Sequence, residues 1–124
     1  MSNDEVDYPV QVRRQVWDSL TSMLRVYAHA ASLNHAQEYV VTCATNEAWV
    51  KHQDSTLSVR ITPDTGEGCW RITRPEREEW GEFRIEADGT LNFPAGSKPL
   101  DAAAIEWLEH LGHAETHRPL ATTP

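Results

Sequence analysis

Cysteine is scarce in this sequence, with Cys43 and Cys69 the only two among 124 residues. Two cysteines cannot form the framework of several disulfides that stabilises many small secreted domains, and their spacing matches no zinc-binding motif. We therefore expect both thiols to be reduced and the protein to be cytoplasmic.

Long hydrophobic runs are absent as well. No stretch approaches the roughly 20 apolar residues that a membrane-spanning helix needs. The chain begins MSNDEVDYP, which is acidic and polar, whereas a secretory signal peptide begins with a basic stretch followed by an apolar one. These features argue against a membrane partner and against secretion by that route.

Positive charge is under-represented. Eleven lysines and arginines stand against 19 aspartates and glutamates, which gives a net charge of −8 and a pI of about 5.1. Nucleic acids and anionic membranes repel such a chain, so we expect neither as a partner. Lys51 and Lys98 are the only lysines, and the remaining cations are arginine, whose planar guanidinium suits bidentate contacts with carboxylates.

The sequence contains no catalytic or cofactor motif that stands out. The GEG fragment at 66–68 leads into a predicted strand, whereas a phosphate loop leads into a helix. Cys43 is close to His35 and His52 in sequence, but a cysteine in the middle of a strand is typical of a small core residue. We therefore predict no catalytic residue and no cofactor, and we favour a non-enzymatic function.

Three histidines near the C-terminus have a spacing that could bind a metal ion. His110, His113 and His117 would share one face of a continuous helix, and three imidazoles can hold zinc. Gly112, however, is typical of the residue that ends a helix. We therefore expect His113 and His117 to lie beyond the helix, and we predict no metal site.

Helical and strand-like periodicities follow one another along the chain in a simple order. Apolar residues recur at steps of three and four over 9–33 and over 99–111. Between them the period changes to two, and turn residues divide the sequence into short strands at 38–45, 48–52, 57–62, 69–73, 80–86 and 90–93. We predict an α+β fold in which a long N-terminal helix packs on an antiparallel β-meander of five to six strands, followed by a short C-terminal helix.

This order corresponds to one domain, because the length and the hydrophobic content of 40% suffice for a single core. We place the domain at 9–112, with a flexible acidic lead-in at 1–8 and a loose C-terminal tail at 113–124. The segment 94–99 is expected to be a loop. The run RPEREEWGE at 74–82 mixes both charges, which is typical of a solvated connection.

Alternation in the central strands places three arginines away from the core. If the apolar residues of 57–61 face inward, the period of two turns Arg60 outward, and the same argument applies to Arg71 and Arg84. The three lie on consecutive strands and could form one cross-strand row. In the simpler interpretation, Glu82 and Glu86 neutralise them in a lattice of salt bridges. In the functional interpretation, they form a cationic stripe that binds a carboxylate-rich partner.

Tryptophan is the one abundant aromatic residue, with five copies. Trp17, Trp70 and Trp107 fit the apolar stripes of their segments, whereas Trp49 and Trp80 have weaker core patterns. We predict that Trp49 and Trp80 are exposed rings that anchor a partner. Alternatively, the aromatic rings line a cavity between the sheet and the long helix.

Two functional hypotheses follow. The leading one is a small non-enzymatic domain that binds another protein or itself through an open sheet face, with a homodimer favoured, using Arg60, Arg71, Arg84, Trp49 and Trp80. The alternative is a small-molecule binding or hydrolytic domain with an aromatic-lined cavity between helix and sheet. A filled core with a flat arginine-bearing face favours the first, and a deep pocket containing a carboxylate or histidine favours the second.

Overall fold

A computed structural model describes the backbone of residues 2–35, 38–86 and 88–121 and the side chains of residues 10–33, 38–86 and 88–112. The chain forms two helices and seven strands in the order α1 (Ser2–His35), β1 (Val40–Cys43), β2 (Glu47–His52), β3 (Ser55–Thr62), β4 (Glu67–Thr73), β5 (Glu78–Ile85), β6 (Thr90–Phe93), β7 (Gly96–Pro99) and α2 (Leu100–Ala121). Among the described residues, no helix combines the length and the apolarity needed to cross a bilayer.

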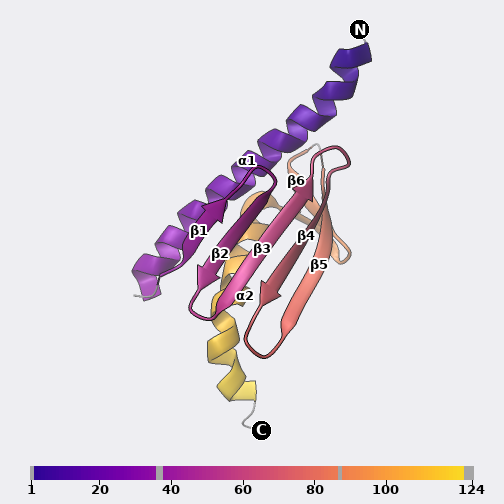
Figure 1. The fold of residues 1–124 in the computed structure, drawn as a ribbon. Helices are drawn as coiled ribbons and strands as arrows, with labels where there is room; N and C mark the ends of the chain where they lie inside the picture. Colours follow the sequence, from indigo (N-terminus) through magenta and orange to yellow (C-terminus); the bar gives the residue numbers. More distant parts are fainter. Residues whose placement is uncertain (1, 36–37, 87, 122–124) are drawn as a thin grey trace.

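The seven strands form one antiparallel sheet in chain order, so each strand pairs with the next. Both helices lie on the same side of this sheet (Figure 1). The helix α1 runs along β1 and α2, whereas α2 contacts β3, β6 and β7 and lies nearer the middle of the sheet. Near the N-terminus of the chain, Arg13 on α1 donates to the carbonyl oxygens of Pro63 and Asp64, at 3.0 and 2.7 Å, and so ties α1 to the β3–β4 turn. The predicted α+β fold is confirmed.

The core fills the space between the helices and the sheet. Alternation in β3 buries Leu57, Val59 and Ile61, as the sequence predicts, and leaves Arg60 outside. The facing of β2 could not be assigned from its sequence, and the structure buries Ala48 and Val50 on the helix side. Each fully buried aliphatic side chain stabilises the fold by about 1.5 to 3 kcal/mol. The other fully buried large residues are Leu20, Leu24, Ile72, Leu91 and Leu111.

The strand count is seven rather than five to six, because 96–99 forms β7 and not a loop. Leu91 pairs with Lys98, and Gly96 has a φ of 143° that lets the chain turn back after β6. A strand of Gly, Ser, Lys and Pro has no apolar alternation, so its sequence carries no strand signal. Lysine and proline on an edge strand also discourage pairing with another sheet.

Both helices are longer than predicted. The helix α1 begins at Ser2, so Pro9 lies within it and residues 2–8 of the predicted lead-in are helical. The helix α2 continues to Ala121, so most of the segment predicted as a loose tail is helical, and Gly112 does not end the helix. A Cβ at Gly112 would collide with the Tyr39 hydroxyl. Glycine at this position lets the Tyr39 hydroxyl approach the helix backbone closely, and it does not terminate the helix.

Candidate functional site

One face of the sheet carries no helix, and its side chains are mostly polar. We call the outward-pointing residues of β1–β5 the open face; they are Val40, Thr42, Glu47, Trp49, Lys51, Thr56, Ser58, Arg60, Thr62, Glu67, Cys69, Arg71, Thr73, Glu78, Trp80, Glu82 and Arg84. All five residues predicted to bind a partner lie on it. Strand alternation therefore brings the predicted site together, whereas its role in binding stays a prediction.

The three arginines do not form one cross-strand row, and that expectation was wrong. Arg60 lies opposite Glu47 and Cys69, whereas Arg71 lies two residues further along β4, between Ser58 and Trp80. The reason is the register, which the turns between strands set and which alternation alone does not specify.

Each open-face arginine is instead paired with a glutamate. The nitrogen–oxygen distances are 3.4 Å for Arg60–Glu47, 3.5 Å for Arg71–Glu78 and 3.7 Å for Arg84–Glu67. The arginine side chains remain 54 to 64% exposed, so each pair contributes about 0 to 1 kcal/mol to stability. The arginines are neutralised as the simpler interpretation expects, but in three separate pairs and not in a lattice, and the acidic partners are Glu47, Glu67 and Glu78 rather than Glu82 and Glu86.

A row of larger side chains crosses the middle of the open face. The register places Trp49, Ser58, Arg71 and Trp80 side by side on β2, β3, β4 and β5. Trp80 is 64% exposed, as predicted, whereas the prediction was wrong for Trp49, which is half-buried on the open face. Three strand spacings separate the two rings, or roughly 14 Å. Two tryptophans therefore flank an arginine whose ion pair with Glu78 is exposed.

A groove of about 600 Å³ adjoins this row where β5 and β6 begin to diverge. Only two residue pairs join β5 to β6, and the open-face part of the groove is lined by Arg60, Glu67, Cys69, Glu82 and Arg84. Both signs of charge and an exposed thiol therefore meet in a concave part of the open face.

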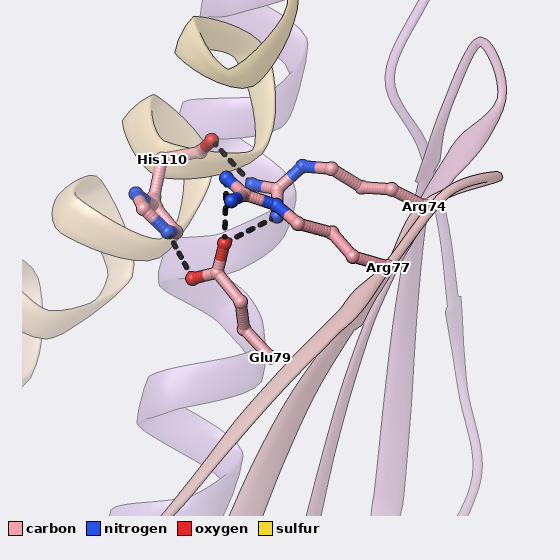
Figure 2. A network of polar contacts seen from close by, with 4 residues as sticks. All are labelled: Arg74, Arg77, Glu79 and His110. Atoms are coloured by element: carbon pink, nitrogen blue, oxygen red, sulfur yellow. Dashed lines mark hydrogen bonds and ion pairs between the residues drawn. The ribbon is translucent and has the colours of Figure 1, made fainter.

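The most tightly held charges lie on the other face of the sheet, in a cluster that we call the polar clamp: Arg74, Arg77, Glu79 and His110 (Figure 2). Arg74 donates from Nη1 to Glu79 Oε2 at 2.6 Å and from Nη2 to the carbonyl oxygen of His110 at 3.2 Å. The side chain of Arg74 is only 1% exposed. The clamp therefore fastens the β4–β5 hairpin to α2.

Glu79 is the centre of the clamp. Its Oε1 lies 2.6 Å from His110 Nε2, and its Oε2 also lies 3.3 Å from Arg77. Partial burial raises the pKa of Glu79, but hydrogen bonds from His110 and Arg74 outweigh this effect and hold the pKa below its usual 4.5. The carboxylate is thus kept ionised among three possible cations, which suits a structural tie.

The charged run at 74–82, predicted to be a solvated connection, instead supplies Arg74, Arg77 and Glu79 to the clamp. A signal was nevertheless present. Phe83 and Ile85 face inward, and a period of two then turns Glu79 and Gly81 inward as well. The charges in the run hid this alternation.

The catalytic and metal alternatives find no support in the described residues. Cys43 lies opposite Ala48, which is four residues from His52 along β2. Roughly 13 Å of strand therefore separates Cys43 from His52. The His52 ring instead stacks on Tyr39, with centroids 3.9 Å apart.

Among the described side chains, no group of three histidine, cysteine, aspartate or glutamate residues is placed to hold a metal. His110 is engaged by Glu79. The side chains of His35, His113 and His117 lie outside the described residues.

Comparisons with known proteins add no further constraint. No protein-family model matches the chain, and neither the curated proteins nor the solved structures contain a significant match to it.

Proposed function

We propose that this protein is a non-enzymatic binding domain that associates with a protein through the open face, and that a second copy of the chain is the favoured partner. The observation that supports this most is the charge balance of the open face. It carries four cations, Lys51, Arg60, Arg71 and Arg84, and four anions, Glu47, Glu67, Glu78 and Glu82.

The charge balance matters because the whole chain has a net charge of −8. The net charge of the open face is zero, so the excess negative charge lies elsewhere on the molecule. Two copies repel each other in most orientations, and this repulsion is smallest when their open faces meet. The balance thus favours one docking orientation over the others.

The arrangement of charges is also self-complementary. Under two-fold symmetry a patch meets its own copy, so a face with equal numbers of arginine or lysine and glutamate residues can pair opposite charges across the interface. The existing ion pairs, at 3.4 to 3.7 Å, are weak enough to exchange partners. Trp80 and Trp49 would supply the aromatic contact area that interfaces favour near their centres.

We also place this function in the cytoplasm. Cys43 and Cys69 are both free thiols, and Cys69 is exposed on the open face. An exposed free thiol at an interaction surface is compatible with a reducing compartment, where it stays unoxidised.

The test is the solution mass measured by light scattering over a range of protein and salt concentrations. We expect a wild-type dimer that dissociates in the Arg60→Ala/Arg71→Ala variant. The matched control is Arg14→Ala/Arg25→Ala, which removes two exposed arginines from α1 and changes the net charge equally. This control should remain a dimer.

A wild-type monomer at all concentrations would overturn self-association. Equal weakening of both double variants would show that net charge, and not the open face, governs association.

A further inference from the structure

A second concave site lies on the helix side of the sheet, between α2 and the strands β4, β6 and β7. It has a volume of about 370 Å³ and is lined by the aromatic rings of Trp70, Phe93 and Trp107. This volume is within the usual range for small-ligand pockets, roughly 300 to 1,000 Å³. We call it the aromatic pocket. It shares no lining residue with the open face.

Gly81 is what allows Trp70 to form one wall. It lies directly opposite Trp70 on β5, and a Cβ there would come within 2.6 Å of the indole nitrogen. With no side chain at this position, the indole lies over the backbone of β5 and remains partly exposed. Any larger residue would displace the ring.

The other two rings are held rigidly. The Phe93 and Trp107 centroids lie 5.9 Å apart with an interplanar angle of 70°, and Phe83 lies 5.7 Å from each of them. Trp107 is only 6% exposed, so its position is set by the core. Trp70 and Phe93 therefore supply most of the aromatic wall of the pocket, and Trp107 contributes only its small exposed part.

The charged residues at the pocket are predominantly acidic. Glu106 and Glu109 line it together with Lys98 and with His110 of the polar clamp, whose ring is engaged by Glu79. Lys98 is already paired with Glu106, and its ammonium lies 5.3 Å from the centroid of the Phe93 ring. The ammonium group of Lys98 thus makes an ion pair with a carboxylate and a cation–π contact with an aromatic ring, which are the two contacts that such a site offers to a cation. Glu109 forms no hydrogen bond or ion pair within the described residues.

We propose that the aromatic pocket binds a methylated ammonium group. A methylated ammonium loses less hydration on entry than a primary ammonium, and aromatic faces attract it electrostatically. Glu109 supplies the countercharge. The group belongs either to a free small molecule or to a methylated lysine side chain, which present the same chemistry. Lys98 occupies the edge of the pocket and competes with the ligand.

The test is a titration of the intact protein with choline, followed through the indole N–H resonances of the five tryptophans in a ¹H–¹⁵N spectrum. The matched control is 3,3-dimethylbutan-1-ol, an uncharged analogue of choline with the same shape. We expect saturable shifts at Trp70 and Trp107 while Trp49 and Trp80 stay unchanged. Choline should bind roughly two- to thirty-fold more tightly than the neutral analogue, which is the range that cation–π contacts support.

Two substitutions should change the affinity for choline in opposite directions. Glu109→Gln should weaken choline binding, whereas Lys98→Gln should strengthen it because the competing ammonium is gone. Glu82→Gln, on the open face, is the control and should change nothing. A parallel titration with N-acetyl-trimethyllysine amide against its unmethylated counterpart separates the two sources of the group by their relative affinities.

Three outcomes would overturn the proposal: no saturable shift in the wild type, equal binding of the neutral analogue, or loss of binding in Lys98→Gln, which would indicate an anion site. This proposal is independent of the proposed function. The Arg60→Ala/Arg71→Ala variant should bind choline as the wild type does, so a failure of either proposal is recognisable by itself.

Discussion

Arg71 and Arg74 lie three residues apart in the sequence, yet they belong to two different regions of the molecule. Arg71 is on the open face, where its side chain is 59% exposed and lies 3.5 Å from its glutamate. Arg74 belongs to the polar clamp, where its side chain is 1% exposed and lies 2.6 Å from Glu79. The same residue type is therefore solvated and loosely paired on one face of the sheet, and buried and tightly paired on the other, so we expect very different contributions to stability.

The largest expected effect comes from Arg74→Ala. It leaves Glu79 without its closest cation and removes a buried aliphatic stem, so the free energy of unfolding should fall by about 3 kcal/mol. Denaturant melts measure this loss. Arg71→Ala is the matched control, with an expected loss below about 1 kcal/mol. Similar losses for the two variants would show that burial does not distinguish these arginines.

Gly81→Ala should have the next largest effect. The added methyl group meets the Trp70 indole at 2.6 to 2.9 Å, and such overpacking costs about 1 to 3 kcal/mol. Cys69→Ala, a small change on the open face, should stay within about 0.5 kcal/mol. The denaturation midpoint gives the stability, and the Trp70 indole resonance gives the displacement. An unchanged resonance together with unchanged stability would mean that Trp70 does not lie against Gly81.

The polar clamp should also make stability dependent on pH. The folded-state pKa of Glu79 is held below its usual 4.5, so its contribution is present above that value and is lost as the pH falls through the folded-state pKa. Glu79→Gln should lower the free energy of unfolding at neutral pH by about 1.5 kcal/mol and flatten its decline in acid.

Chemical melts of both proteins between neutral pH and strong acid measure this difference. The exposed Glu82→Gln is the control and should keep the wild-type slope. Parallel curves for the wild type and Glu79→Gln would contradict an ionised Glu79 in the clamp.

The smallest effect is expected for Arg60→Ala/Arg71→Ala. Both side chains are more than half exposed, so the stability of the isolated chain should change by less than about 1 kcal/mol. The free energy of unfolding is measured at a protein concentration too low for association. A larger loss would show that these arginines stabilise the fold of the single chain and do not act only in an interface. In that case, dissociation of the variant could result from its lower stability and would no longer show that the two arginines contact the second copy.

Sequence periodicity was sufficient to predict which residues of the central strands point toward the core and which point outward. The outward placement of Arg60, Arg71 and Arg84 follows from alternation with Leu57, Ile72 and Ile85, which needs only neighbouring residues. The inward turn of Glu79 follows from the same rule, although the charges around it hid the pattern. The exposure of Trp80 was likewise predictable, because its strand has apolar partners only on the other face.

What the sequence by itself determined is therefore local: the two helices, the first six strands, their order and the faces of the central strands β3, β4 and β5. The tertiary structure decided the rest. Gly112 lies within α2 and against Tyr39, Arg74 is buried because α2 covers it, and the arginines are staggered because turn geometry sets the register. The physical reason is that alternation and helical period arise from backbone geometry within a few residues, whereas burial and register depend on contacts between segments distant in the chain.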